Sequence, residues 1–567
     1  MKQMANTHNK SVSRRNWLGA MGKISLGTGL AVVTSNSFGT ERPGPVKTTT
    51  NDIGARVYNI RDFGAKGDGK TLDTFAVQSA IDLCNKEQGG TVLVPAGVFV
   101  IGSVELKSNV TLHIAAQGKL LGSADGKQYH ASEAIPLDSG WTMNDGNVGL
   151  IFAANAENIT IEGNGTIDGQ GAQFRSDTKG VLPPAGISGN HRPYHLLFYQ
   201  CKNLTVRDIS LINSAYHSIR VCMCTLGKFE GLYIRSKVIH NNDGFHFIGS
   251  TYMHVSNCDV QCQDDACALF GSCKFVTVSD CSFSTRWSVF RFGGGEAENI
   301  TVSNCLIYET YGCPIKMRCS PGSRFENISF SNLVMKDVTG PISIGSGNGK
   351  SSVNPIANTP AIVRNISFNH IHATVVKPVQ LRDAEFTSKY NPGEIFSCVT
   401  LNAMDDIFLE NISFNDVHIA FPGGGTAEHG AVRDVPKVAA EYYQIGVPPA
   451  YGIYARNVRG LTLHNVRLTM ESPDLRPAVI LDNVEDATLN GLSAQGQKKS
   501  ESLLRFINTR DVLVSALRVL TPVTNLLQAE GKDCANIIID GGDTSKADKA
   551  LVLTSGASPK AVKLRVL

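Results

Sequence analysis

The chain has 567 residues, of which 42% are hydrophobic and 18% charged, a composition typical of a globular protein with a large core. Such a length fits several domains or one long repeat array. The 53 basic and 50 acidic residues leave a formal net charge of only +3, which argues against nucleic acid as a partner. The 55 glycines and three tryptophans favour a turn-rich β architecture over a helical bundle.

Residues 1–40 are predicted to be a twin-arginine-type export signal. Arg14 and Arg15 stand in a segment that resembles the twin-arginine motif, and an apolar, glycine-rich stretch follows at 18–33. That stretch is too short and too weakly apolar to predict a membrane span, and no cysteine nearby offers a lipid anchor. We expect export to the bacterial periplasm or the cell exterior, with a basic tail as the alternative.

Fourteen cysteines in an exported chain would ordinarily suggest disulfides. Cys258, Cys281 and Cys305, however, end three similar phrases spaced 23 and 24 residues apart. Small apolar side chains that stack in successive repeats explain this regularity. Disulfides and metal binding are the alternatives, although the sequence has no Cys-x-x-Cys pair and no His/Cys spacing typical of zinc.

A phrase of Asn, or a near equivalent, followed by alternating apolar and polar residues recurs along nearly the whole chain. It begins at Asn109, Asn158, Asn203, Asn299, Asn327, Asn365, Asn411, Gly460 and Asn536. Such alternation predicts half-buried strands. Where no long loop intervenes, the phrases recur every 22–28 residues, which is shorter than the roughly 30 residues of a βαβ unit. We therefore predict an all-β parallel β-helix, in which the asparagines stack their amides as a ladder. An amphipathic helix at 74–86 is expected to cap its first coil.

Several segments resemble known sequences. Residues 62–69 (D-F-G-A-K-G-D-G) and 89–97 (G-G-T-V-L-V-P-A-G) resemble the opening of pectin-degrading β-helix proteins. Residues 165–171 (G-T-I-D-G-Q-G) and 192–199, with the acidic motifs below, resemble glycoside hydrolase family 28, the polygalacturonases and their relatives. Residues 442–452 are similar to bacterial members.

This resemblance covers residues 58–490 and implies a single-stranded right-handed parallel β-helix of the pectin-lyase-like kind. The expected organisation is an export signal at 1–40 and a cap with the first coils at 55–125. A catalytic β-helix domain follows at 126–545, and a C-terminal tail at 546–567.

Two of the family's four catalytic motifs are recognisable. Asn241-Asn242-Asp243 is similar to its Asn-Thr-Asp, and Asp264-Asp265 to its Asp-Asp. Asp243 and Asp264 are 21 residues apart, about one coil, so their carboxylates are expected on one outer face, where repulsion raises at least one pKa. The resemblance implies that Asp264 protonates the glycosidic oxygen while Asp243 and Asp265 activate water, an inverting arrangement. A backbone-capping carboxylate cluster and a calcium site are the alternatives.

The other two motifs depart from the family. Arg286 stands where the family's Gly-His-Gly histidine is expected, and of its Arg-Ile-Lys only Lys316 is kept, since Pro314 replaces the arginine. We expect substrate contacts from Asn241, His246, Arg286, Trp287, Arg291, Lys316 and Arg318. The alternatives are solvated surface positions for the arginines, a structural role for His246 and surface packing for Trp287.

Three functions stay open at this point. The predicted one is an inverting glycosidase that acts, as a monomer and without a cofactor, on a pectic or other uronate-containing polysaccharide or oligosaccharide. A polysaccharide lyase would use Arg286 or Lys316 as base, with calcium or arginine as neutraliser, and a non-catalytic β-helix would only bind glycan. The lost histidine and arginine predict a divergent specificity, for a branched, modified or sulfated chain. Loops at 125–148 and 421–449 are expected to wall the cleft.

Overall fold

The computed structural model describes residues 53–136, 147–174, 192–346, 359–385, 389–404, 407–436 and 442–565. The export signal expected at 1–40 lies outside these residues and stays a prediction. Residues 52–567 form one compact unit, so the expected boundary near residue 125 does not separate two bodies. Within the part of the chain described, no helix is long and apolar enough to cross a membrane.

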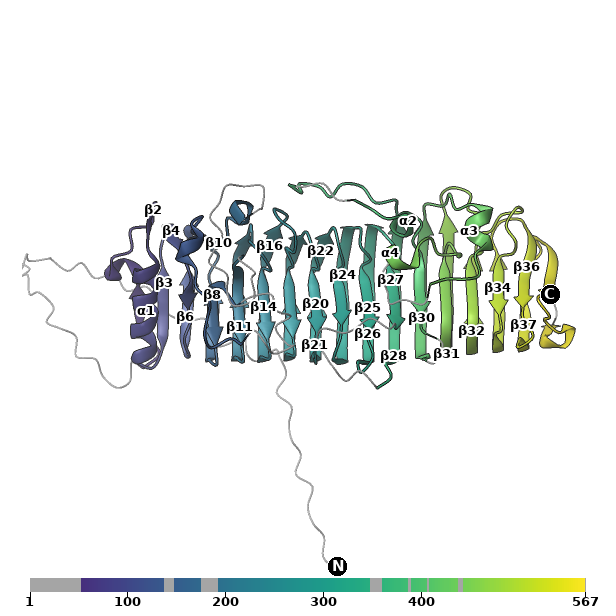
Figure 1. Ribbon diagram of the computed structural model, residues 1–567, viewed down its shortest axis with the longest axis horizontal. Helices are drawn as coiled ribbons and strands as arrows, with labels where there is room; N and C mark the ends of the chain where they lie inside the picture. Colours follow the sequence, from purple (N-terminus) through teal and green to yellow (C-terminus); the bar gives the residue numbers. More distant parts are fainter. Residues whose placement is uncertain are drawn as a thin grey trace, which may run out of the picture. The chain divides into compact units, whose positions relative to one another are not determined.

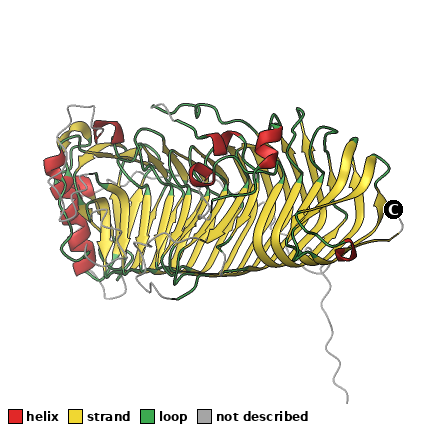
Figure 2. Ribbon diagram, turned by 45° about the vertical axis from the view of Figure 1, so that its right-hand side comes forward, coloured by secondary structure: helices red, strands yellow, loops and turns green. Residues whose placement is uncertain are grey.

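This unit is a right-handed parallel β-helix, as predicted (Figure 1). A coil contributes three short strands, for example β17 (Phe245–Ile248), β18 (Thr251–Ser256) and β19 (Asp259–Cys262), and each pairs in parallel with its counterpart in the next coil. Alternation decides which side chains enter the core: in β18, Met253 is buried and Tyr252 is exposed. Figure 2 shows the strands as one stack, with the helices outside it.

The predicted asparagine ladder is confirmed. The side-chain amide of Asn158 donates to Oδ1 of Asn109 at 2.8 Å, and Asn203 donates to Asn158 at the same distance. Further along the stack, Asn411 donates to Asn365 at 3.0 Å. These residues have φ between 53° and 64°, a left-handed conformation that asparagine tolerates better than most side chains. The ladder therefore fixes both the turn and the stacking of consecutive coils.

All 14 cysteines are buried and free, which confirms the core-stacking prediction and excludes the disulfide alternative. Cys258 and Cys281 lie one above the other, with the backbone N–H of Cys258 donating to Sγ of Cys281 at 3.4 Å. Cys201 and Cys224 repeat this contact at 3.3 Å. The thiols thus fill equivalent places in the core, as the repeat spacing indicated.

The N-terminal end of the stack agrees with the sequence prediction, whereas the C-terminal end does not. Helix α1 (Thr74–Lys86) occupies the expected range, with Val77 and Ile81 fully buried beside the first coil. The separate C-terminal tail expected at 546–567 is wrong, because β38 (Ala547–Thr554) pairs in parallel with β36 (Val523–Glu530). Likewise β39 (Val562–Arg565) pairs with β37 (Ala535–Asp543). The alternation of apolar residues in β38 is short but sufficient to continue the coils.

Candidate functional site

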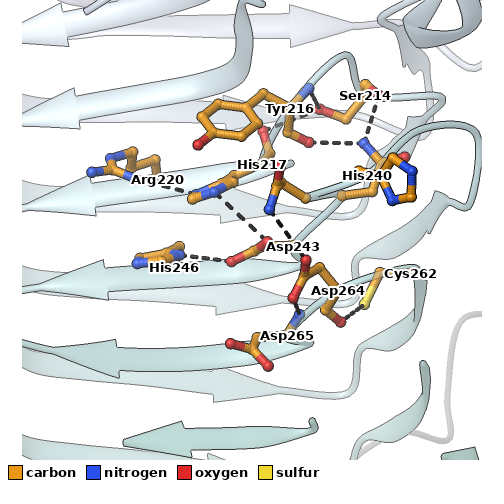
Figure 3. A network of polar contacts seen from close by, with 12 residues as sticks. Ser214, Tyr216, His217, Arg220, His240, Asp243, His246, Cys262, Asp264 and Asp265 are labelled. Carbon is orange, nitrogen blue, oxygen red and sulfur yellow. Dashed lines mark hydrogen bonds and ion pairs between the residues drawn. The ribbon is translucent and has the colours of Figure 1, made fainter. Parts of the chain in front are cut away.

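Five neighbouring strands of one sheet carry the candidate site. They are β14 (Ile219–Cys222), β17, β20 (Cys267–Phe270), β23 (Phe290–Gly293) and β25 (Ile315–Cys319), paired in that order. Asp243 lies in the turn just before β17, and Asp264 and Asp265 lie in the turn just before β20. Because parallel strands begin at the same sheet edge, the three carboxylates meet there (Figure 3).

Asn242 builds the turn that presents Asp243. Its amide donates to the carbonyls of Ser214 and Tyr216 in the preceding coil, at 2.8 and 3.0 Å. Its Oδ1 accepts the backbone N–H groups of Val238 and Ile239, at 3.1 and 3.0 Å. This fully buried side chain therefore ties the turn that leads into Asp243 to the preceding coil.

The paired aspartates are held by different donors. Asp264 accepts from the side chain of Asn241 at 3.3 Å and from the backbone N–H of Asp265 at 3.0 Å. Asp265 accepts the backbone N–H of Ser288 at 3.3 Å and lies 3.9 Å from Nε of Arg291. Of the predicted substrate-contact residues, Asn241 and Arg291 thus lie directly against this pair of aspartates.

Asp264 is partly exposed, whereas Asp243 and Asp265 are buried. Removal of water from around the carboxyl group, and next the charge of Asp265, raise the pKa of Asp264 to about 7, although Lys316 and Arg286 oppose this shift. A carboxyl group with such a pKa has a proton to donate at neutral pH. Asp264 therefore combines access from outside with the protonation state of an acid catalyst.

Two histidines flank the carboxylate of Asp243. Nδ1 of His246 lies 2.7 Å from Oδ2, and Nε2 of His217 lies 3.6 Å from Oδ1. The two rings stack with centroids 4.4 Å apart and an interplanar angle of 13°. Among the residues described, these three groups place their ligand atoms within 4.8 Å of one another, a spacing that could hold a metal ion. Burial lowers the pKa of both histidines well below the ordinary value, so both rings are neutral at neutral pH.

His217 was not predicted from the sequence. It precedes β14 as Asp243 precedes β17, so counting one coil back from Asp243 would have suggested it.

Arg286 does not lie where the sequence interpretation placed it. The residue whose backbone N–H donates to Asp265 is Ser288, two residues further along the chain. The buried guanidinium of Arg286 donates to the carbonyl of Lys389 at 2.8 Å and to Glu394 at 3.3 Å, and lies over the ring of Tyr390. These contacts lie in a segment that is described at 376–385 and 389–398, and Arg286 reaches Asp264 through its charge.

The described parts of that segment lie against the coils that carry the acids, a contact that the sequence did not reveal. Arg382 accepts a hydrogen bond on its carbonyl from Nζ of Lys237 at 3.1 Å, and Asp383 pairs with Arg235 at 2.7 Å. Together with Arg286, these contacts tie the segment to the coils that carry the acids. Of the walls that were expected, the described part of 421–449 is held to later coils, where Arg456 donates to the carbonyl of Val435 at 2.6 Å.

Three cations, Arg220, Arg291 and Lys316, share one line of positions on the outer face of the sheet with the neutral His246. The register Arg220, His246, Ala268, Arg291, Lys316 places these residues on consecutive strands at equivalent positions. Arg220, which the sequence analysis did not single out, is almost fully buried, as are Arg291 and Lys316. Nζ of Lys316 lies 4.3 Å from the ring centre of Trp287. Arg318, two residues on in β25, is partly exposed on the same face.

Comparison with known proteins adds independent support. Residues 84–388, more than half of the chain, match the model of the family "Glycosyl hydrolases family 28". Polygalacturonase-2 of Solanum lycopersicum is 26% identical over 371 residues, which cover 64% of this chain and 75% of that protein. An exo-poly-alpha-D-galacturonosidase of Dickeya chrysanthemi is 33% identical over 221 residues, 36% of each chain.

The structure of a family 28 exopolygalacturonase from Yersinia enterocolitica matches with a TM-score of 0.52 at 20% identity, over 76% of this chain and 78% of that one, and supports the fold. All three aspartates lie inside the span that matches the family model. The chain belongs to the glycosyl hydrolases of family 28 and is an O-glycosyl hydrolase.

Proposed function

We propose that this protein is an inverting hydrolase of a pectic or other uronate-containing polysaccharide, with Asp264 as general acid and Asp243 and Asp265 as the groups that activate water. The proposal rests on a contrast among the three aspartates of the site. Asp264 is accessible and has a pKa of about 7, whereas its two neighbours are buried acceptors held by hydrogen bonds.

In this mechanism Asp264 gives its proton to the glycosidic oxygen as the bond to the leaving sugar breaks. Asn241 and the backbone of Asp265 keep the carboxyl group oriented during that transfer. A water molecule on the opposite side of the sugar ring is held by Asp243 and Asp265 and loses a proton as it attacks. The product then has the inverted anomeric configuration.

The cations support an anionic substrate. Arg291 and Lys316 lie beside the acids, and an arginine or lysine at this spot can bind a carboxylate on the sugar ring. The relatives compared above are named as a polygalacturonase and an exo-poly-alpha-D-galacturonosidase, which points to galacturonic acid units. Trp287, against which Lys316 packs, adds an aromatic face for a sugar ring. Export, expected from residues 1–40, would bring the enzyme to such polymers.

The first test is the product formed from polygalacturonate and from its branched derivatives. We expect new reducing ends whose anomeric signals in a fast NMR time course show inversion, without the ultraviolet absorbance of unsaturated uronates. Unsaturated ends would instead indicate a lyase, and binding without any product would indicate a glycan-binding protein. Retained configuration in the first product would contradict the water-activating roles of Asp243 and Asp265.

The pH dependence of kcat follows from the state of the acid. Because Asp264 works protonated, kcat should be high below its pKa and fall as the pH rises through about 7. Lys316 lowers that pKa, so Lys316→Gln should move the alkaline limb to higher pH. The control is Lys336→Gln. It changes a lysine whose side chain is 62% exposed and which lies on β26 (Arg324–Val338), outside the five strands of the site, so the alkaline limb should stay in place. An alkaline limb that stays fixed in Lys316→Gln would argue against Asp264 as the acid.

A further inference from the structure

The environment of Asp243 decides where the protons of its two histidines lie. Arg220 can only donate, and its Nη1 lies 3.4 Å from Nδ1 of His217, so Nδ1 must be the acceptor nitrogen. A neutral His217 therefore carries its single proton on Nε2, the nitrogen that faces Asp243 (Figure 3).

The same reasoning applies to His246. A carboxylate can only accept, so the 2.7 Å contact with Asp243 requires a proton on Nδ1 of His246. The other nitrogen, Nε2, is buried and has no hydrogen-bond partner among the residues described. A neutral ring is thus most stable with its proton on Nδ1. Each histidine offers one N–H to a different oxygen of the same carboxylate.

We infer that His246 and His217 are positioning residues that hold Asp243 ionised and aligned for proton abstraction from the attacking water. The hydrogen bond from His246 and the N–H of His217, which faces the other oxygen at 3.6 Å, both favour the charged form of this carboxylate, and the hydrogen bond fixes its plane. The inference rests on the proposed function, because it gives Asp243 the task of a base. The two rings thus support the catalytic carboxylate in a chain that lacks the family's usual histidine.

The packing around the rings explains how they keep this geometry. His246 is held between His217 and Phe270, whose ring centroid lies 5.0 Å away. His217 in turn lies against Tyr216 and Tyr194, with ring centroids 4.3 and 5.2 Å away. Both histidines are 3% exposed, so neither ring can turn towards solvent.

The charged groups near the rings also favour their neutral forms. The guanidinium groups of Arg220 and Arg291, on β14 and β23, oppose protonation of His246. Arg192 and Arg220 oppose protonation of His217. Asp243 and, through the next coil, Asp265 are the nearby carboxylates. Burial, the largest cause, and these cations together keep the rings from becoming imidazolium ions that would neutralise the base.

This arrangement is distinct from a metal site built from the same three residues. A metal ion needs the unprotonated nitrogen of each ring, whereas both nitrogens that face Asp243 carry protons in the assignment above. Stoichiometric metal in the purified protein, lost in a His246 variant, would therefore overturn the inference. Elemental analysis of the full chain as purified measures this directly.

Two substitutions at His246 separate hydrogen bonding from packing. His246→Phe keeps a flat ring between His217 and Phe270 but removes the donor to Asp243. His246→Asn loses the ring but places an amide N–H near the position of Nδ1. If the donor is what matters, His246→Phe should lower kcat by roughly ten- to a hundredfold, less than most of the roughly 10²–10⁴-fold that general acid–base catalysis supplies, because Asp243 itself stays in place. His246→Asn should recover most of that loss.

The acidic limb of the kcat profile gives a second readout. It should move to higher pH in His246→Phe, because the carboxylate is then harder to ionise, and return in His246→Asn, with KM little changed in both. A purely structural role predicts the reverse order, with Phe the milder change, and that order would refute the inference. Melting temperatures of both variants show whether they fold.

A measurement without turnover keeps this inference separate from the proposed function. In protein labelled with ¹⁵N histidine, the ring signals missing from His246→Phe and from His217→Phe identify each residue. We expect a neutral ring with the proton on Nδ1 for His246 and on Nε2 for His217 from about pH 5 to 8. The opposite tautomers would refute the inference even if the enzyme is active. The expected tautomers in a protein that cleaves no glycan would refute the proposed function alone.

Discussion

Asp264→Asn is expected to lower kcat on polygalacturonate by roughly 10²–10⁴-fold, the contribution of a well-placed general acid. Asparagine has nearly the same shape and can still accept from Asn241 and Asp265, but it has no acidic proton for the leaving oxygen. KM should change little, because the substitution leaves the cations of the site in place. Initial rates of reducing-end release at saturating substrate measure the effect.

Stability gives the control for this variant. The unfolded chain releases the proton of an aspartic acid near pH 4, whereas the folded protein holds that of Asp264 to about pH 7. The ionised group therefore weakens the folded state as the pH rises through this window, and asparagine avoids that cost. At pH values above 7 the variant should melt no lower than the unchanged protein.

Asp280→Asn, at an exposed turn outside the site sheet, is the matched substitution and should keep full activity. Equal loss in both variants, or a fully active Asp264→Asn, would remove Asp264 from the mechanism.

Phe368→Ala is expected to reduce the free energy of unfolding by about 3–5 kcal/mol, the usual cost of removing a buried phenylalanine. Phe368 is fully buried and stacks between Phe330 and Phe414, with ring centroids 5.3 and 4.9 Å away. Its loss leaves a cavity that the coils above and below cannot close, because their spacing is fixed by backbone hydrogen bonds. Urea unfolding followed by circular dichroism measures the change.

Phe275→Ala is the comparison for that experiment. Phe275 is 43% exposed and stacks only on Tyr252 at the surface of the helix. Its removal should cost within about 1 kcal/mol, as surface substitutions usually do. Similar losses at the two positions would show that the aromatic stack inside the helix does not contribute as the burial indicates.

The fold could be predicted from the local sequence pattern. Apolar and polar residues alternate in each coil, and this alternation indicates which side of a strand is buried without any knowledge of its position in the fold. The recurring asparagine marks the turn, and its amide ladder is observed from Asn109 onwards. The same regularity continues more weakly through Leu551 and Leu553, which is why the last coils were mistaken for a tail.

The acids were also predictable, since Asp243 and the Asp264–Asp265 pair are one coil apart and each precedes a strand of the same sheet. The residues around them were harder to place. Counting coils placed Arg286 against the acids, whereas its guanidinium contacts Lys389 and Glu394, and the group that meets Asp265 is the backbone N–H of Ser288. His217 carried no signal of its own beyond its place in the preceding coil.

By itself, then, the sequence determined the parallel β-helix, its ladder and its three aspartates, because each depends on a pattern repeated within one or two coils. Only the tertiary structure decided the contacts of residues 376–385 and 389–398 with the coils that carry the acids, the partners of Arg286 and the groups that face Asp243. Lys237 and Arg382, for example, are 145 residues apart, and no local pattern encodes such a contact. The proton-donating state of Asp264 likewise depends on burial and on charges from neighbouring coils, which exist only once the chain is folded.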